Sequence, residues 1–433
     1  MGLSTPDCYD EIESASRDEL QALQLDRMRW SLKQAYENVP HYKSAFDKLG
    51  VVPADLKDLF DLSRFPLLSK QDMRNSYPFG LFATPMKDVI RLHSSTGTTG
   101  NPVVVGHTQN DIAMWTHVAA RSLYAVGARA EDFIHIGLVY SLKTGAFPIH
   151  YGAEKIGCTV VPASGDPTEK HVKYLLDFKP RLFISNRSQV LTILDEFERM
   201  NIDPREAGVE IGLFGGETGS KAMREIVAKK FGIEALEIYG LTEVCGAGMS
   251  TQTPGSGDGI TIWEDYFYPE IIDPSTGETL PDGEYGELVI TSLKKEASPI
   301  IRYRTKDITA ILPPAERSMR RLAPLKGRAD DIVVFNGKSI YPLDIEQELL
   351  TDSRVRPFYQ FVISEDNNGD KFTIDVEMSN ALAASDTSAQ EACSADLIAE
   401  IKDKSGISVE LNLKSPMTYP RGPNKSVRLV DQR

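Results

Sequence analysis

Short apolar runs alternate with helix-forming stretches through the middle of the chain, and this alternation limits the fold more than any other feature. The runs are DFIHIGLVY (132–140), GCTVVPAS (157–164), RLFISN (181–186), EIGLFGG (210–216) and ALEIYG (235–240). They are rich in apolar, β-branched and aromatic residues, and each is followed by a candidate helix. Strands that alternate with helices are typical of a parallel sheet, so we expect an α/β core.

The regions on either side have different patterns. Apolar residues near helical spacing predict helices across residues 9–49. After Gly257, the turn signals Pro-Ser-Thr-Gly (274–277) and Pro-Asp-Gly (281–283) separate β-type runs. Such turn residues between β-type runs predict antiparallel hairpins.

The last quarter of the chain has the pattern of a separate small domain. From Gly327 onwards come two β-type runs, a polar Ala/Ser stretch (380–395), and then a helix and a strand. A chain of 433 residues is also too long for one ordinary core. We therefore expect a large domain over residues 1–326 and a small α+β domain over residues 327–433.

Charge and cysteine content exclude several function classes. The formal net charge of -14 argues against binding to nucleic acids or anionic membranes, which attract basic surfaces. The four cysteines form no CxxC pair, so we expect neither a zinc site nor a disulfide framework. The acidic start lacks the apolar run of a secretion signal, and no apolar segment is long enough to span a bilayer. These features favour a cytoplasmic protein.

The stretch HSSTGTTGNPVVVGHT (93–108) crowds hydroxyl side chains and glycines between two β-type runs. Glycines permit left-handed backbone, and successive amides in such turns can form a nest for an anion. The common signatures GxGxxG, GxSxG and HExxH do not occur in the chain. Gly337-Lys338-Ser339 fails as a Walker loop because Ile332 stands where the first glycine belongs. Alone, the stretch fits a polyphosphate-binding loop and a solvated linker equally well.

Five segments, in their order along the chain, resemble the motifs of the adenylate-forming superfamily. They are SSTGTTGNP (94–102), YGLTEVCG (239–246), RYRTKD (302–307), GRADDIVVFNGKSIYPLDIE (327–346) and a tail with Lys425 and Arg428. In that family these motifs are the phosphate loop, the YGxTE motif, the ribose motif, the hinge motif and the C-terminal lysine signature. The chain more closely resembles the phenylacetate–CoA ligase branch, over nearly its whole length.

The resemblance implies both an architecture and a reaction. The architecture is a large N-terminal domain with parallel-rich sheets and a β-rich portion, followed by a small mobile C-terminal domain. The reaction is ATP-dependent ligation of a small aromatic acid to coenzyme A, with Mg²⁺ as a further cofactor. The carboxylate attacks ATP to give an acyl-adenylate and pyrophosphate, and a thiol then displaces AMP.

The resemblance also assigns site residues. Those implied for ATP or AMP are Ser94, Ser95, Thr96, Gly97, Thr98, Thr99, Gly100, Gly216, Glu217, Tyr239, Gly240, Asp307 and Arg328. Those implied for the acyl pocket are Leu138, Tyr140, Lys143, Ala146, Phe147, His150, Gly215 and Gly216. Ser339 and Tyr341 are implied beside coenzyme A, and Asp330 is implied as the hinge.

The implied roles suit the chemistry of the side chains. Glu243, with the hydroxyl of Thr242 beside it, offers the oxygen ligands that Mg²⁺ prefers. Asp307 can accept hydrogen bonds from both ribose hydroxyls, and Arg328 can donate planar, charge-assisted bonds to ribose or phosphate. Lys425 would neutralise charge at the α-phosphate as the acid attacks. Because its domain then blocks the thiol, the two halves of the reaction require a rotation at Asp330.

The chain departs from this branch at three places. The segment LPPAERSMRRLAP (312–324) lacks the cysteine cluster that often follows the ribose motif. Gly215 to Gly219 read GGETG where the branch has GAEPW. The pocket segment GLVYSLKTGAFPIHYG (137–152) has Leu138 in place of a tyrosine and Lys143 in place of an aromatic residue. On this basis we expect a substituted benzoate such as anthranilate or salicylate, with phenylacetate as the next candidate.

Other functions remain open from the sequence. The thiol acceptor can be a carrier protein instead of coenzyme A, and a catalytically silent AMP-binding protein is a third reading. Intact Glu243, Asp307, Arg328 and Lys425 argue against the silent protein. The sequence is compatible with a homodimer as well as with a monomer.

Overall fold

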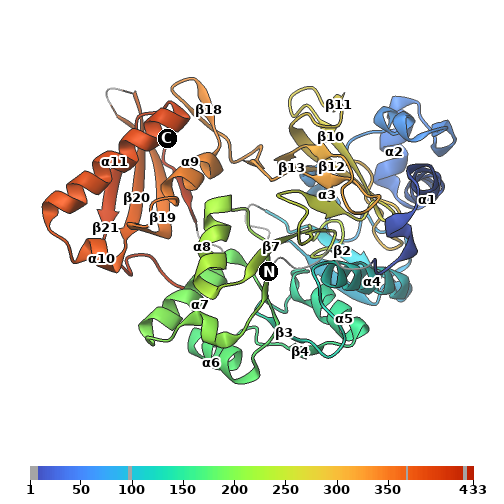
Figure 1. The fold of residues 1–433 in the computed structure, drawn as a ribbon. Helices are drawn as coiled ribbons and strands as arrows, with labels where there is room; N and C mark the ends of the chain where they lie inside the picture. Colours follow the sequence, from blue (N-terminus) through green and yellow to red (C-terminus); the bar gives the residue numbers. More distant parts are fainter. Residues whose placement is uncertain (1–7, 96–99, 367–368, 423–426) are drawn as a thin grey trace.

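The structure is a computed structural model that describes residues 8–95, 100–366, 369–422 and 427–433. Figure 1 shows a large body and, at its left, a smaller body that contains the C-terminus. Among the described residues, no helix has the length and apolar character needed to cross a bilayer.

The core of the large body is a mixed sheet in the order β14-β15-β9-β8-β7-β6-β5-β3-β4. Its parallel strands are β3 (Phe133–Ile136), β4 (Thr159–Val161), β5 (Leu182–Ser185), β6 (Ile211–Gly215) and β7 (Glu234–Tyr239). The helices between them are α5 (Ala146–Ile156), α6 (Thr168–Phe178), α7 (Arg187–Arg199) and α8 (Lys221–Phe231), and α4 (Gln109–Ala125) precedes β3. This confirms the expected α/β core with its parallel-rich sheet.

The prediction that a helix follows ALEIYG is wrong. After β7 the chain makes a turn and returns as β8 (Ser250–Gln252), which pairs antiparallel with β7. Gly240 permits this tight turn, since a Cβ there would lie 1.7 Å from the carbonyl oxygen of Gly246. The sheet continues antiparallel through β9 (Ile260–Ile262), β15 (Arg321–Leu322) and β14 (Ile311–Leu312).

A second, antiparallel sheet follows and confirms the predicted hairpins. Its order is β11-β10-β12-β13-β16. The strands are β10 (Phe267–Ile272), β11 (Thr279–Leu280), β12 (Gly286–Ser292), β13 (Tyr303–Thr309) and β16 (Gly327–Arg328). The β10–β11 turn forms where the sequence signals it, because Asp273 accepts hydrogen bonds from the amides of Ser275 and Thr276. Gly327 and Arg328 thus pair with the large domain's sheet.

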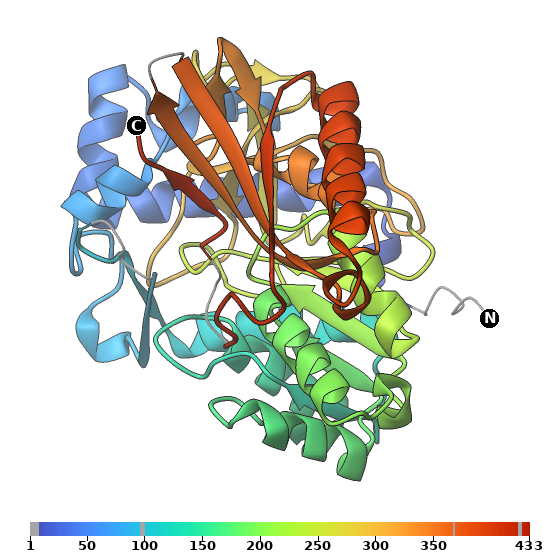
Figure 2. The same cartoon turned by 90° about the vertical axis from the view of Figure 1, so that its left-hand side faces the viewer.

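The smaller body has its own sheet, in the order β21-β20-β19-β22. Its elements are β17 (Val333–Phe335), β18 (Lys338–Ile340), α9 (Pro342–Leu349), β19 (Val355–Asp366), β20 (Gly369–Met378), α10 (Asn380–Ala383), α11 (Thr387–Ser405), β21 (Glu410–Lys414) and β22 (Leu429–Asp431). Figure 2 shows α11 running along this sheet. Helix α11 begins inside the polar Ala/Ser stretch, which the sequence pattern places before the helix.

Helices at the N-terminus pack against the two larger sheets and share a hydrophobic core with them. They are α1 (Arg17–Asn38), α2 (Pro40–Leu49) and α3 (Lys70–Asn75), with 3-10 turns η1 (Glu11–Ser14), η2 (Pro53–Asp55), η3 (Leu59–Arg64) and η4 (Met86–Asp88). A further turn, η5 (Pro204–Ala207), precedes β6. Helix α1 starts at a capping box in which Ser16 and Glu19 satisfy each other's backbone amides. The helices predicted across residues 9–49 are therefore present.

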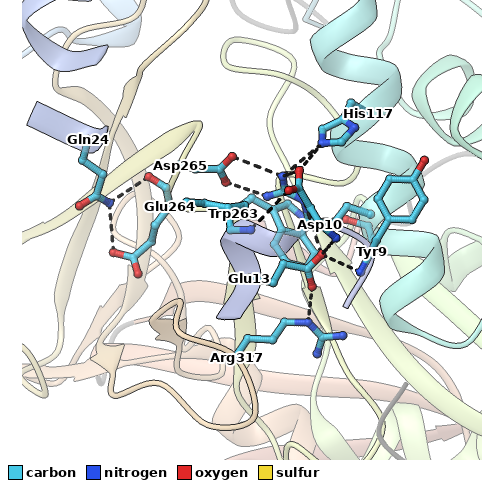
Figure 3. Close-up of polar contacts among 12 residues, drawn as sticks. Tyr9, Asp10, Glu13, Gln24, His117, Trp263, Glu264, Asp265 and Arg317 are labelled. Atoms are coloured by element: carbon cyan, nitrogen blue, oxygen red, sulfur yellow. Dashed lines mark hydrogen bonds and ion pairs between the residues drawn. The ribbon is translucent and has the colours of Figure 1, made fainter. Parts of the chain in front are cut away.

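A buried cluster of charges ties this N-terminal segment to the sheets (Figure 3). Fully buried Arg121 on α4 donates to Asp265 Oδ1 at 2.7 Å and to Asp10 Oδ2 at 2.9 Å. Arg317 donates to Glu13 Oε2 at 2.6 Å. Because both arginines are paired with carboxylates, the segment can bury its charges without leaving them uncompensated.

We predict that Arg121→Met destabilises the protein by about 3–5 kcal/mol, because it strands buried carboxylates beside an apolar side chain. Urea unfolding at pH 7 measures the loss. Arg205→Met is the matched control, since exposed Arg205 forms its only ion pair within the described residues with nearby Asp203, and we expect little change. Equal stabilities of Arg121→Met and the control would contradict the anchoring role.

Candidate active site

The base of the phosphate loop is an antiparallel pair, β1 (Arg91–Ser94) and β2 (Val104–His107). The amide of Ser95 donates to Val103 O at 3.0 Å, and the amide of Val103 donates to Ser95 Oγ at 3.1 Å. Gly100 has a φ of 104°, in the left-handed region. The predicted residues Thr96, Gly97, Thr98 and Thr99 lie outside the described residues, so the structure places the ends of this loop and not its tip.

The loop base also contacts the segment assigned to the acyl pocket. The amide of Ser94 donates to Leu142 O at 2.8 Å, and His93 Nδ1 lies 2.9 Å from the same oxygen. The hydroxyl oxygens of Thr144 and Thr242 lie 3.0 Å apart and share a hydrogen bond. Three motif segments that are far apart in the sequence are thus joined by short polar contacts.

Glu243 lies in the turn after β7 and is buried, with 4% of its surface exposed. Lys70, the first residue of α3, lies 3.1 Å from Glu243 Oε1. Burial and then the charge of Glu243 hold the pKa of Tyr303 well above its usual value. Glu243 therefore presents a carboxylate whose charge is balanced by one lysine.

A buried lysine fixes the backbone of this turn. Lys295 Nζ donates to Val244 O at 2.9 Å and to Glu243 O at 3.4 Å. Burial lowers the pKa of Lys295, while Asp111 opposes that shift. Lys295 and Thr144 together therefore hold the turn that carries Thr242 and Glu243.

Tyr239, Asp307 and Arg328 form a second cluster. The Tyr239 hydroxyl donates to Asp307 Oδ2 at 2.5 Å, and Arg328 Nη1 lies 3.5 Å from Asp307 Oδ1. Asp307 and Arg328 are register partners across β13 and β16. Burial raises the pKa of Asp307 to about 6, although Tyr239 and Arg328 both favour its charged form.

Asp330, the residue predicted as the hinge, is linked to this cluster. Arg328 Nε and Nη2 donate to the two carboxylate oxygens of Asp330 at 2.9 and 3.1 Å. One guanidinium therefore contacts both the carboxylate assigned to ribose and the carboxylate assigned to the hinge. Of the residues assigned to coenzyme A, Ser339 lies exposed on β18 and Tyr341 caps the start of α9.

The glycine-rich strand end after β6 is tightly constrained. A Cβ on Gly215 would lie 2.2 Å from Ile238 O, so only glycine fits there. Gly216 has a φ of 77° and open space around it. Glu217 turns towards α7, where its Oε2 accepts hydrogen bonds from Ser188 Oγ at 2.7 Å and the Ser188 amide at 3.1 Å.

Apart from Gly215 and Gly216, the residues assigned to the acyl pocket lie on the segment from β3 into α5. Tyr140 OH lies 2.9 Å from His150 Nδ1, and its ring meets Phe147 edge-on at 5.3 Å. Leu138 and Ala146 are buried. Lys143 is exposed. The substitution of Lys143 for an aromatic residue therefore places no charge in the buried part of this segment.

Two site residues escaped the sequence analysis, and Lys425, which was predicted, lies outside the described residues. Lys70 carried a signal, since a lysine in the first turn of a helix opposes the helix dipole. Lys295 carried none, because a Lys-Lys pair before a turn normally faces solvent. In the described ranges, no group of three or more His, Cys, Asp or Glu side chains is placed to hold a metal ion.

The chain matches two families along its length. Residues 63–293 match the family described as AMP-binding enzyme, and residues 337–433 match the AMP-binding enzyme C-terminal domain. Phenylacetate–coenzyme A ligase of Aromatoleum evansii is 48% identical, covering 99% of this chain and 98% of that protein. The enzyme of the same name from Escherichia coli K12 is 44% identical, covering 98% and 97%.

Two solved states of one enzyme indicate the domain arrangement. 2-Hydroxyisobutyryl–CoA ligase in the postadenylation state, in complex with R3-HIB-AMP, matches with a TM-score of 0.93 and 25% identity, covering 98% of this chain and 92% of that one. The same enzyme in the thioesterification state, with 2-HIB-AMP and CoA, matches with a TM-score of only 0.72, covering 97% and 91%. The two bodies of this structure are therefore arranged as in the postadenylation state.

These full-length matches confirm the resemblance read from the five motifs, and the chain belongs to the AMP-binding enzyme family of adenylate-forming acid–CoA ligases, in the branch that contains phenylacetate–CoA ligase.

Proposed function

We propose that this chain joins phenylacetate, or a closely similar aromatic acid, to coenzyme A through an acyl-adenylate. The observation that carries the proposal is the surroundings of Asp307. This one buried carboxylate of the ribose motif lies within electrostatic range of Tyr239 and Glu243 and of Arg328 and Asp330. With Asp307 itself, three separate motifs therefore meet there. A nucleotide held at Asp307 would reach all of them.

The ribose end of the nucleotide is assigned to Asp307. Its two oxygens are acceptors for the two ribose hydroxyls, and Tyr239 and Arg328 orient it from either side. Its carboxylate must be charged to accept both bonds. A pKa of about 6 keeps it mostly charged at pH 7.

The phosphate end is assigned to the loop beyond Ser95 and to Glu243. A single carboxylate with a neighbouring hydroxyl suits Mg²⁺, which is commonly held by one or two carboxylates together with substrate phosphates. Glu243 and Thr242 fit this donor set, and the ion would neutralise phosphate charge there. Lys70, which balances Glu243 at 3.1 Å in this structure, would then be available to the phosphates.

Phenylacetate is a better candidate for the acid substrate than a substituted benzoate. The relatives of 44–48% identity are named phenylacetate–coenzyme A ligases. The arguments for a benzoate are also weaker: Lys143 is exposed, and Arg187 fills the space beside Gly219, where a Cβ would lie 2.8 Å from its Nη1. Two features still favour a substituted benzoate: the open space at Gly216, and Leu138 in the place of the tyrosine that is common in this branch.

The test is thioester formation with free coenzyme A, ATP and a panel of phenylacetate, benzoate, anthranilate and salicylate. We expect the highest kcat/KM with phenylacetate. A clear preference for anthranilate or salicylate would overturn the choice of acid. Acyl-adenylate formation without transfer to free coenzyme A would point to a carrier protein, and no ATP–pyrophosphate exchange with any acid would point to a silent nucleotide-binding protein.

We predict that nucleoside affinity falls below pH 6, since protonation of Asp307 removes an acceptor. Its pKa of about 6 implies that adenosine binds about tenfold more weakly at pH 5 than at pH 7. Adenosine is the suitable probe, because it has no phosphate that titrates in this range. Asp307→Asn should bind weakly at both values, and calorimetry showing the same pH dependence in this variant would exclude Asp307 as the titrating group.

We predict that Lys425→Ala lowers adenylate formation by about 10²- to 10³-fold, because it removes a preorganised charge from the α-phosphate. Transfer from a supplied acyl-adenylate to coenzyme A should stay near the wild-type rate. Single-turnover measurements separate the two halves. An equal loss in both would refute the role of Lys425.

A further inference from the structure

A cluster of charged side chains joins the two bodies at helix α7. The carboxylate of Asp195 on α7 accepts charge-assisted hydrogen bonds from Arg356 Nη2 and, at 2.5 Å, from Arg421 Nε. Behind them, Arg421 Nη2 donates to Glu377 Oε2 at 2.7 Å. The side chains of Asp195, Arg356 and Arg421 are only 10–12% exposed, and that of Glu377 is fully buried.

The charges of this cluster do not balance within the smaller body. Arg356 lies on β19, Glu377 on β20 and Arg421 in the segment after β21, so two guanidinium groups face one carboxylate there. Asp195 supplies the missing negative charge from the large domain, and Glu198 on the same helix adds a second, more exposed carboxylate 3.4 Å from Arg356 Nη2. Separating the domains would therefore leave a net positive charge on one surface and bare carboxylates on the other.

The cluster is rigid on the side of the smaller body. The Arg421 guanidinium lies 3.4 Å from the ring centroid of Phe358 and also donates to Tyr419 O at 2.6 Å. The next residue, Gly422, donates its amide to Thr192 Oγ1 on α7 at 3.3 Å. An arginine that is stacked and bonded in this way cannot follow Asp195 far, so the contact depends on the domain angle.

A second polar contact closes the other end of the interface. Buried Glu346 on α9 accepts hydrogen bonds from the Ser220 amide at 2.7 Å and the Ser220 hydroxyl at 2.8 Å, at the start of α8. Arg428 donates to the same carboxylate at 2.7 Å. Arg421 and Arg428 lie on either side of Lys425 in the sequence. The segment of Arg421 is thus bonded to Asp195 of the large domain, and the segment of Arg428 is bonded to Glu346, which itself binds Ser220 of the large domain.

These contacts occur in a domain arrangement that matches the postadenylation state far better than the thioesterification state. We propose that Asp195 is a positioning residue for adenylate formation: by bridging Arg356 and Arg421 it holds the C-terminal domain where that half-reaction occurs, and it is released for thioester formation. This inference rests on the proposed function for its two half-reactions.

The test is Asp195→Asn, which keeps the size of the side chain and removes its charge. We expect ATP–pyrophosphate exchange to fall about tenfold, as for other partly buried charge pairs. Thioester formation from a supplied phenylacetyl-adenylate should be unchanged or faster. Asp195→Glu should recover most of the exchange rate, and Asp195→Lys should lower it further because it repels both arginines.

The matched control is Glu196→Gln, one residue along the same helix. Glu196 pairs only with Arg199 in the described residues, at 2.5 Å, and this substitution removes the same charge without touching the domain contact. We expect both half-reactions to keep their rates. An equal loss of both half-reactions in Asp195→Asn, or rates that match those of Glu196→Gln, would overturn the proposal.

Small-angle X-ray scattering gives a readout that does not depend on activity. The Asp195→Lys profile should depart from the wild-type profile, as the domains leave this arrangement, and the Glu196→Gln profile should not. If the wild type shows no exchange with any acid, the proposed function fails. The scattering change would still support the domain contact, and identical profiles for all three proteins would refute it.

Discussion

The guanidinium of Arg328 is the contact on which the site depends. It lies 3.5 Å from Asp307 on one side and forms two bonds with Asp330 on the other. It can do so because β16 pairs Arg328 with Asp307 at the edge of the antiparallel sheet, directly before the chain leaves the large domain. The carboxylates predicted for the nucleotide and for the hinge thus share one cation, and the charge state of the first affects the second.

Buried charges elsewhere follow the same rule of compensation. Fully buried Arg121 donates to the carboxylates of Asp265 and Asp10, and Lys295 donates to two carbonyl oxygens. Each would be costly alone. Their use here is to fix segments that regular secondary structure does not hold, namely the N-terminal segment and the turn that carries Glu243. Buried charged side chains therefore hold both the N-terminal segment and the turn of the candidate site in place.

The sequence predicted the repeating parts of the fold well, because buried parallel strands such as Leu182–Ser185 are continuous apolar runs. It failed after ALEIYG, where the contact between Gly240 and Gly246 turns the chain back as a strand. The motif residues Asp307 and Arg328 were predicted by resemblance, and the structure places them together. Lys295 and the pairing of Asp195 with Arg356 depend on contacts between segments over 50 residues apart, which no local pattern encodes.

The shared acceptor Leu142 O has a consequence for how the two predicted binding sites affect each other. The amide of Ser94 and the ring of His93, at the base of the phosphate loop, both contact this one carbonyl, which belongs to the segment of the acyl pocket. A ligand that shifts either side must shift the other. Thermodynamic reciprocity then requires that any factor by which ATP changes the affinity for the acid equals the factor by which the acid changes the affinity for ATP. Any such coupling between the two predicted sites has a direct physical route through the hydrogen bonds at Leu142 O.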